Sequence, residues 1–451
     1  MNAPTREELR RGWCPSTLKP METGDGWLVR LHPPDARLTP AGLRRVAALA
    51  AEHGNGLIEI STRANLQIRG VTPESHPILA ERLLAEGLLD EHDGDGPQRL
   101  TLVSPLAEAR RHSGASRSEE PGTHEHDGDH RSDGRGLIDA AALSEAIEAH
   151  GRNIRGLPPK FSIIVDDGGP CSLDAVPCDL RLVGIAEGTV ALGLADRHWR
   201  GPVPEAEAAA AVRSILQGFA DLHRTAPDSI RRLRDLSHEA LAGLTDFPEI
   251  APPARRPSPQ RAGLFAMTGD RFAALIGLPF GRCDAATLDR LAEAAAPEGD
   301  IRCSPWRGLA FRGLDHAQAE RLLTLAQSLG LIVADEDPRL SVQACAGSTA
   351  CSRAEAPTMA DAARLAEAAA DLLAQGVSLH ASGCIKACAH PGMADLTLVG
   401  RAGRYDVVLG GTTRDKPLAT LDLAALLARL QPGQDIHARL AEAVRKTGPR
   451  G

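Results

Sequence analysis

The sequence predicts an α+β protein made of two similar halves, each followed by its own α/β module. The main observation is an internal repeat, in which Thr23-Gly24-Asp25 recurs as Thr268-Gly269-Asp270 and an apolar strand follows each copy. Both copies then continue in the order helix, strand, helix at almost constant spacing. Two copies of one such unit, distant in the sequence, are expected to pack as a pseudo-symmetric pair.

Apolar periodicity and turn residues predict the elements in order. The first half should contain a strand at 27–31, a helix from Leu43, strands within 57–70 and a helix at 77–89; the second half should contain a strand at 271–278, a helix from Leu288, strands within 300–313 and a helix at 315–329. The first module should contain a helix at 137–150, strands at 160–166, 181–185 and 189–194, and helices at 204–223 and 228–242. The second module should contain a helix at 360–375, strands at 394–399 and 404–409, and terminal helices.

Two breaks in composition separate these units. Residues 107–134 contain no Ile, Leu, Val or Phe, so this stretch is expected to be disordered, and its four histidines are either part of a solvated linker, the preferred interpretation, or weak metal ligands. These are His112, His124, His126 and His130. The predicted units are a first half-repeat at 1–104, an insertion at 105–135, a first module at 136–246, a linker at 247–262, a second half-repeat at 263–335 and a cysteine-bearing module at 336–451.

Composition excludes several classes of protein. The 451 residues carry 51 basic and 59 acidic side chains, a net charge of −8, which argues against a nucleic-acid-binding face. No apolar run approaches the roughly 20 residues that cross a bilayer, and the N-terminus has no signal-peptide core, so no membrane partner is expected. Nine cysteines are an odd number in a chain without an export signal, which predicts a reducing compartment, the cytoplasm.

Four of the cysteines form the strongest chemical pattern. Cys345 and Cys351 are followed after 32 residues by Cys384 and Cys388. Paired thiolates suit a metal site, and the x5 and x3 spacings suit a [4Fe–4S] cluster better than the tighter pairs of a structural zinc site. Zinc and four buried free thiols remain alternatives. No role is assigned to the other five, Cys14, Cys171, Cys178, Cys283 and Cys303.

Several motifs, in one order along the chain, resemble the siroheme-dependent sulfite and nitrite reductase family. They are ACAGSTAC at 344–351, SGCIKACAHP at 382–391, ISTRANLQIRG at 60–70, LPPKF at 157–161 and IRCSPWR at 301–307. The resemblance implies two ferredoxin-like half-domains, a [4Fe–4S] cluster on the four cysteines, and a tetrapyrrole site. Within the family, the opening residues 11–30 and Cys388-Ala-His390-Pro391 are most similar to the precorrin-3B synthases of aerobic cobalamin biosynthesis.

The resemblance also implies an activity and a substrate site. The activity is hydroxylation of precorrin-3A at C20 by O2 with formation of a γ-lactone, supplied with electrons by a donor such as an NADH-linked reductase or a ferredoxin. A ring that carries carboxylates around its rim needs fixed cations, for which Arg is well suited. Each basic residue could instead be an ordinary surface charge. The expected rim residues are Arg30, Arg63, Arg99, Lys160 and Gln67, with Arg302, Arg307 and Lys386 as weaker candidates.

The departures from the reductase pattern favour the synthase. Where the reductases have Arg-x-Arg and Lys-x-Lys, this chain has Arg30-Leu-His32 and Lys160-Phe-Ser162, which weakens the cationic nest that binds sulfite. The resemblance also implies a mononuclear non-haem iron, but no clear spacing of two histidines and a carboxylate is present. His390 is the candidate ligand or proton donor near the cluster, although a structural cap is the simpler reading. A siroheme-dependent nitrite or sulfite reductase and a non-catalytic tetrapyrrole carrier remain alternative functions.

Overall fold

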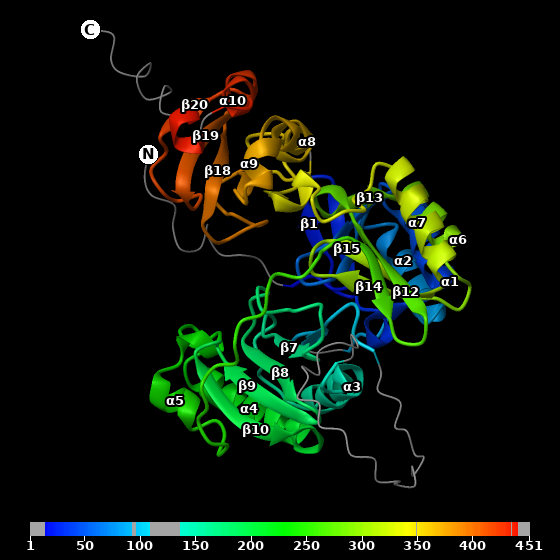
Figure 1. Cartoon of the computed structure of the whole chain (residues 1–451), viewed down its shortest axis with the longest axis vertical. Coiled ribbons are helices and arrows are strands. Elements are labelled where there is room, and N and C mark those ends of the chain that lie inside the picture. The colour runs from blue at the N-terminus through cyan, green and yellow to red at the C-terminus, as the bar shows by residue number, and fades with distance from the viewer. Residues whose placement is uncertain (1–13, 93–95, 109–135, 349, 434, 441–451) are drawn as a thin grey trace, which may run out of the picture.

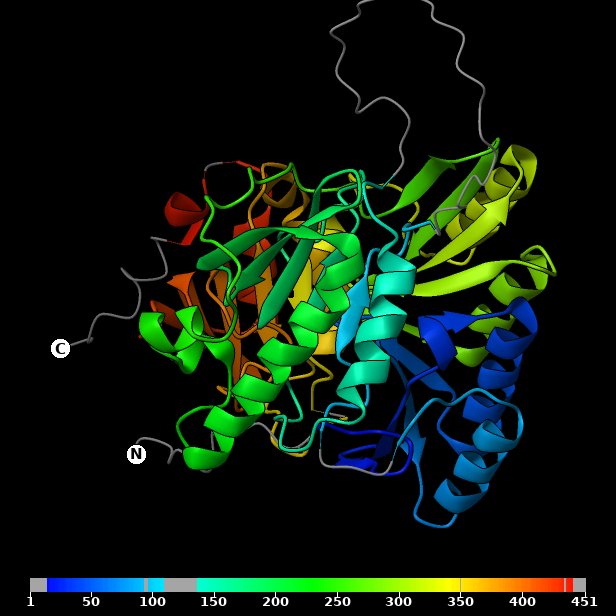
Figure 2. The same cartoon turned by 90° about the horizontal axis from the view of Figure 1, so that it is seen from below.

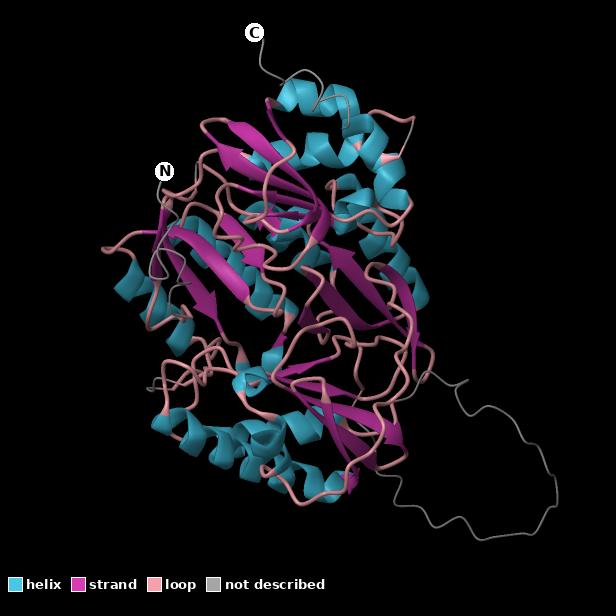
Figure 3. Ribbon diagram, turned by 90° about the vertical axis from the view of Figure 1, so that its left-hand side faces the viewer, coloured by secondary structure: helices cyan, strands magenta, loops and turns pink. Residues whose placement is uncertain are grey.

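The computed structural model describes residues 14–92, 96–108, 136–348, 350–433 and 435–440. It contains four five-stranded sheets with helices packed on them, which confirms the predicted α+β class. Figure 1 shows the cysteine-bearing module at the upper end, the first α/β module at the lower end, and the two half-repeats side by side next to both. In Figure 3 many of the helices gather at the upper and lower ends.

The two half-repeats form two sheets that exchange a strand. The sheet of the first half has the order β1-β2-β5-β4-β13, so its last strand comes from the second half. The sheet of the second half has the order β11-β12-β15-β14-β3, and its last strand comes from the first half. The strands are β1 (Met21–Thr23), β2 (Gly26–Leu31), β3 (Arg37–Leu38), β4 (Leu57–Ile60), β5 (Leu66–Val71), β11 (Gly263–Met267), β12 (Arg271–Gly277), β13 (Arg282–Asp284), β14 (Asp300–Ser304) and β15 (Gly308–Leu314).

The helices of the two halves share one hydrophobic core and the same local signals. In α1 (Pro40–His53) the N-cap Thr39 accepts from the Gly42 N–H, and in α6 (Ala285–Ala294) the N-cap Asp284 accepts from the Thr287 N–H. Nε of Arg44 lies 2.9 Å from Oδ1 of Asp289, the equivalent position 245 residues later. Each half adds a second helix, α2 (His76–Ala85) or α7 (His316–Ser328), over the same continuous core.

The first α/β module has a sheet of order β10-β9-β8-β7-β6, in which β6, β7 and β8 are parallel. Helices α3 (Ala140–Gly151) and α4 (Glu205–Thr225) lie side by side on this sheet (Figure 2). The strands are β6 (Thr101–Val103), β7 (Ile163–Asp166), β8 (Leu180–Ala186), β9 (Thr189–Leu194) and β10 (His198–Pro204).

The helix predicted at 228–242 is mostly wrong. Only α5 (His238–Ala242) is helical apart from a short 3-10 turn at Leu233–Asp235. The Asp235 carboxylate accepts the N–H groups of Arg231 and Arg232, and Arg232 forms an ion pair with the buried Asp179. These side-chain contacts hold the segment against the sheet in a form that competes with a helix.

The cysteine-bearing module has a sheet of order β16-β17-β18-β19-β20, with β16, β17 and β18 parallel. The helix predicted at 360–375 is present as two pieces, α8 (Thr358–Ala368) and α9 (Ala370–Ala374), and α10 (Leu423–Leu430) follows the sheet. The strands are β16 (Val342–Ala344), β17 (Leu379–Ser382), β18 (Ala394–Arg401), β19 (Arg404–Gly411) and β20 (Ala419–Leu421).

Two segments expected to be loose are docked at least in part. The predicted insertion starts at 105, but the carbonyl of the buried Ala107 accepts from Arg302 and Arg312, at 3.0 and 2.8 Å. Residues 109–135, with their four histidines, lie outside the described residues. In the predicted linker, Arg256 binds the carboxylates of Asp166 and Asp174. None of the helices in the described ranges is long and apolar enough to cross a membrane.

Candidate functional site

The four cysteines of the predicted cluster follow two neighbouring parallel strands. Cys345 comes directly after β16 and Cys351 lies further along the same loop, whereas Cys384 and Cys388 follow β17. The strands pair in parallel, with Ala344 opposite Ala381, so both loops leave the sheet at the same end, where the carboxyl ends of the strands lie. The N–H of Cys345 also donates to the carbonyl of Ala381 at 3.2 Å, which ties the first loop to the second strand.

Contacts around the thiols bring the two loops together. The N–H of Gly383 donates to Sγ of Cys345 at 3.1 Å, and the Thr358 hydroxyl lies 3.2 Å from the same sulfur. A side chain at position 383 would meet Cβ of Ala354 at 2.5 Å, so only glycine allows this approach. Burial raises the pKa of Cys384, and the neighbouring Cys351 and Cys345 raise it further. The site is therefore prepared for a cationic group that would stabilise thiolates.

The spread of the sulfurs separates two metal classes. A tetrahedral zinc ion with Zn–S bonds of about 2.3 Å would hold its sulfurs about 3.8 Å apart. In the part of the chain that the structure describes, no three of the four cysteine sulfurs lie within 4.8 Å of one another. This arrangement does not match the compact ligand set of a single zinc ion.

Each half-repeat holds one cysteine loop. From the first half, the Gly24 N–H and Nη2 of Arg69 both donate to the carbonyl of Ala350, at 3.2 and 3.1 Å. From the second half, Nη2 of Arg307 donates to the carbonyl of Ala389 at 3.3 Å. A side chain at position 24 would collide with the Cys351 N atom at 2.8 Å. The pseudo-symmetric pair thus positions the loop of Cys351 and the loop of Cys388.

Three of the predicted rim residues line one cavity. This cavity of about 240 Å³ lies between both half-repeats, α3 and the end of β6, and Arg63, Arg99 and Arg302 are on its wall. Arg37 and Arg152 add positive charge, while acidic residues such as Asp90 and Glu148 lie among them. Asp90 is paired with Arg152, and Glu148 accepts the N–H groups of Leu100 and Thr101.

Arg30 and Gln67 form a second group outside this cavity wall. Nε and Nη2 of Arg30 donate to Oε1 of Gln67, at 3.1 and 2.8 Å, across the paired strands β2 and β5. Burial lowers the pKa of Arg30, while the nearby Cys14 thiol, which the sequence left without a role, acts in the opposite direction. Gln67 therefore orients the Arg30 guanidinium.

Lys160 and Arg307 are placed differently from the cavity residues. Lys160 is half-buried, and its carbonyl accepts from Arg232. Arg307 donates to the carbonyls of Phe280, in the turn between β12 and β13, and of Ala389, so it links the second half-repeat to the loop of Cys388. Burial lowers its pKa. The predicted rim is thus distributed over the cavity, the β2–β5 pair and the cluster side.

His390, the histidine that the sequence singled out, packs against a second histidine that the sequence did not point to. Nε2 of His390 lies 3.0 Å from the carbonyl of Met393. His380 on β17 packs against it with ring centroids 5.5 Å apart, and burial lowers the pKa of His380 to about 4. Both ring nitrogens of His380 are buried without a hydrogen-bond partner among the described residues. A histidine inside an apolar strand that leads into the cysteine loop was the available sequence signal.

The two departures from the reductase pattern have clear local causes. Nδ1 of the buried His32 lies 2.9 Å from Oε1 of Glu91, and burial lowers the pKa of His32 despite this carboxylate. The imidazole is therefore neutral at pH 7. The Ser162 hydroxyl accepts from Nη2 of Arg63 at 2.5 Å, where a lysine would repel this guanidinium. Both positions lack the positive charge that the reductases carry.

Comparison with known proteins places this arrangement in a family. The family described as "Nitrite/Sulfite reductase ferredoxin-like half domain" matches residues 19–86 and 266–329, the two copies of the repeat. A precorrin-3B synthase from Sinorhizobium sp is 33% identical, covering 95% of this chain and 90% of that protein. The chain belongs to the nitrite/sulfite reductase family, in its precorrin-3B synthase branch.

Two further proteins are similar along most of the chain at lower identity. A ferredoxin–nitrite reductase from Synechococcus elongatus is 26% identical, covering 89% of this chain and 81% of that protein. The solved structure of Mycobacterium tuberculosis NirA protein matches with a TM-score of 0.67 at 20% identity, covering 92% of this chain and 83% of that one. This likeness shows the fold, and it confirms the predicted nitrite/sulfite reductase-like architecture.

Proposed function

We propose that this protein is a precorrin-3B synthase, which hydroxylates precorrin-3A at C20 with O2 and forms the γ-lactone. The observation that carries the proposal is the similarity to the Sinorhizobium synthase along 95% of the chain. The neutral His32 and Ser162 also stand where the reductase pattern has two positive charges, which reduction of a small oxo-anion would use. The synthase chemistry does not need them. The proposed location is the cytoplasm.

The arginine-lined cavity supports binding of a carboxylated ring edge. Its volume of about 240 Å³ is below the roughly 300–1,000 Å³ of typical ligand sites, so it would take carboxylate arms and not a whole macrocycle. Burial, and then the neighbouring Arg232, lower the pKa of Arg63, which means that its surroundings disfavour positive charge. A substrate carboxylate would relieve this cost through charge-assisted hydrogen bonds. Arg99 and Arg302, on the same cavity wall, would supply further hydrogen bonds to substrate carboxylates.

The remaining rim residues would contact the ring outside the cavity. Arg30 is oriented by Gln67, and Lys160 precedes by two residues Ser162, which accepts from Arg63. Arg307 would hold the loop of Cys388 and would not bind a substrate carboxylate. These positions would fix the ring so that one face points toward the cluster side of the molecule.

Four cysteines, Cys345, Cys351, Cys384 and Cys388, would hold a [4Fe–4S] cluster, which supplies single electrons when it is bound. The Gly383 N–H donates a hydrogen bond to Sγ of Cys345, and the Thr358 hydroxyl lies beside the same sulfur. An external donor, an NADH-linked reductase or a ferredoxin, would deliver the electrons. The proposed mononuclear non-haem iron has no assigned ligands; His390 follows Cys388 by two residues, and His380 packs against it.

The decisive experiment uses anaerobically reconstituted protein, precorrin-3A, a reductant and ¹⁸O2, followed by mass spectrometry of the product. Incorporation of ¹⁸O into a lactone-bearing product is expected. Siroheme absorption in the purified protein together with rapid sulfite or nitrite reduction would support the reductase alternative instead. Tight binding of precorrin-3A without any O2 consumption would identify a carrier.

A further inference from the structure

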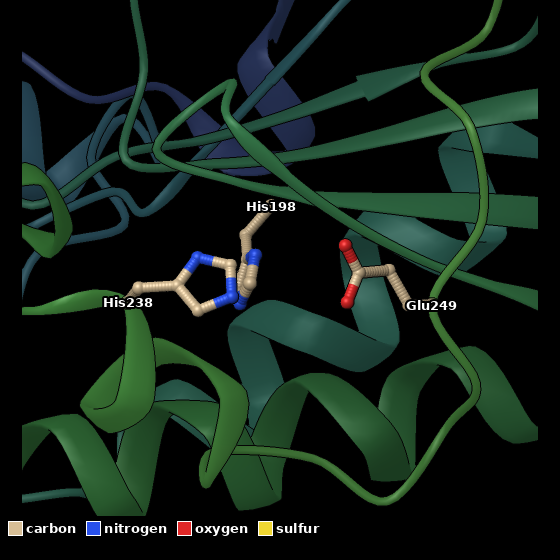
Figure 4. A group of neighbouring side chains, drawn as sticks. All are labelled: His198, His238 and Glu249. Atoms are coloured by element: carbon tan, nitrogen blue, oxygen red, sulfur yellow. The ribbon is translucent and has the colours of Figure 1, made fainter.

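Three side chains converge at the outer edge of the first α/β module, away from the cysteines and the cavity. His198 begins the edge strand β10, His238 begins α5, and Glu249 lies in a segment that pairs with β10 through Arg200. One ligand atom from each residue lies within 4.8 Å of the other two. Figure 4 shows the two imidazole rings next to each other with the Glu249 carboxylate turned toward them.

The state of His198 indicates that a partner is needed here. His198 is only 2% exposed, and its Nε2 atom has no hydrogen-bond partner in the described part of the chain. The ring centroids of His198 and His238 are 4.0 Å apart at an interplanar angle of 64°. A buried ring nitrogen without a partner is costly, and a metal ion is one of the few groups that would satisfy it together with a second imidazole. His238 and Glu249 are exposed, so an ion can enter from solvent.

We propose that His198, His238 and Glu249 bind one divalent transition-metal ion of borderline character, such as Zn²⁺ or Fe²⁺. Two imidazoles and one carboxylate are a ligand set that these ions prefer, and it is poor for Ca²⁺ or Mg²⁺, which take oxygen ligands. The nearby Arg197 and Arg200 act against a cation, and the Glu249 carboxylate offsets part of this repulsion. Affinity would therefore come from direct coordination and not from a general negative field.

The site is separate from the proposed catalytic region. The cavity is lined by β6 and α3, whereas the metal ligands surround β10 at the opposite edge of the same sheet. Four strand spacings of about 4.8 Å, or about 19 Å, separate the two edges. In Figure 1, α5 and α3 accordingly lie on opposite sides of the module. An ion at this place cannot reach a substrate in the cavity.

Its role would be to fasten three elements together. The helix α5 has five residues, and the segment after it meets β10 through only a few hydrogen bonds, such as those from Ile250 N to Trp199 O and from Gly201 N to Pro248 O. This segment leads into the chain that connects to the second half-repeat. A bound ion would close the loops between the three ligands and add its binding energy to folding.

The test measures Zn²⁺ binding by cluster-loaded, full-length protein at equilibrium, with the cluster absorbance followed to show that the cysteines stay occupied. His238→Ala should weaken zinc binding by more than about 100-fold, since even residues that only support metal ligands typically cost 10–100-fold when replaced. Glu249→Gln should weaken it by about tenfold or more. Both residues are exposed, so the variants should fold normally.

A matched control is His316→Ala on α7, where another exposed histidine lies 3.5 Å from a carboxylate, Glu320, and no third ligand joins them among the described residues. This variant should bind zinc as the parent does. Zinc should raise the melting temperature of the parent and the control but not of His238→Ala. Metal analysis of the purified proteins should show zinc, or iron beyond that of the cluster, which is lost in His238→Ala. Absence of zinc binding by the parent, or equal binding by all variants, would overturn the proposal.

Discussion

The two α/β modules have the same sheet topology, but different side chains lie at the carboxyl ends of their parallel strands. In both, three parallel strands are followed by two antiparallel ones, β6 to β10 in the first and β16 to β20 in the second. The loops after the first two strands of the second module carry the four cysteines. In the first module, Asp166 is instead the last residue of β7, and its carboxylate is paired with Arg256.

The difference shows that the same end of the same kind of sheet can hold either an ion pair or a group of thiols. The residues at the strand ends and in the following loops determine which of the two is present. In the first module the edge is closed by an internal ion pair, and burial raises the pKa of both Cys171 and Cys178 to about 12, so these thiols are inert at neutral pH. In the second module the Gly383 N–H donates to Sγ of Cys345, so the two cysteine loops meet at the corresponding end of the sheet. The following predictions test this contrast.

The largest effect is expected from the cysteines. Cys384→Ser should remove most of the cluster iron and sulfide and lower the melting temperature, because ligation contributes to folding. Cys171→Ser and Cys178→Ser are the matched controls from the first module and should keep both iron and sulfide. Iron and sulfide analysis with thermal unfolding checks the prediction. Full cluster occupancy in Cys384→Ser would contradict the assignment.

The ion pair of the first module should be nearly as important for stability. Arg256→Met leaves the fully buried Asp166 without its partner and should cost about 3–5 kcal/mol of unfolding free energy. Arg255→Met, at an exposed neighbouring position, should change little. Chemical denaturation measures both. A loss below about 1 kcal/mol for Arg256→Met would show that this edge does not depend on the pair.

The first module should also respond to pH through Asp167. Burial raises the pKa of Asp167 from 3.8 to about 6, so the folded state holds this proton more tightly than the unfolded chain does. Stability from this group is therefore complete below about pH 3.9 and is lost as pH rises to about 6. Asp167→Asn should remove this dependence and stabilise the protein at pH 8 by about 3 kcal/mol. Denaturation at several pH values, with Asp174→Asn as the contrasting carboxylate, checks it.

The arginine cavity at the end of β6 should affect the substrate and not the cluster. Arg63→Gln or Arg99→Gln should weaken precorrin-3A binding by about one to two powers of ten, since a desolvated charge-assisted hydrogen bond contributes about 1.5–3 kcal/mol. The exposed Arg155→Gln serves as a control. Equilibrium binding with iron analysis separates the two roles. Unchanged affinity in both cavity variants would show that the substrate carboxylates do not bind in this cavity.

The smallest effect is expected from restoring the reductase charges. The double variant His32→Arg with Ser162→Lys should still fail to reduce sulfite, because the proposed pocket is shaped for a ring that enters and leaves as a substrate. Sulfite-dependent oxidation of a reduced dye measures the activity. Efficient reduction by the variant or by the parent, with bound siroheme, would replace the synthase proposal by the reductase alternative.

Local and repeated patterns made much of this molecule predictable. The duplicated half-domains follow from equivalent N-caps at Thr39 and Asp284 and from the repeated strands, because caps and periodicity depend on neighbours in sequence. The four cysteines follow two neighbouring parallel strands, one pair after each strand, which agrees with their pairing along the sequence. The helix expected at 228–242 was wrong because Asp179, distant in sequence, holds Arg232.

The sequence by itself determined the α+β class, the repeat and the cysteine pairs, since each is written in short-range spacing. Only the tertiary structure decided the strand exchange of β3 and β13, the docking of Ala107 on Arg302 and Arg312, and the separation of Arg307 from the cavity. It alone also brought His198, His238 and Glu249 together. The physical reason is that these contacts join residues whose neighbours in sequence carry no signal of the partner, so packing of distant elements selects them.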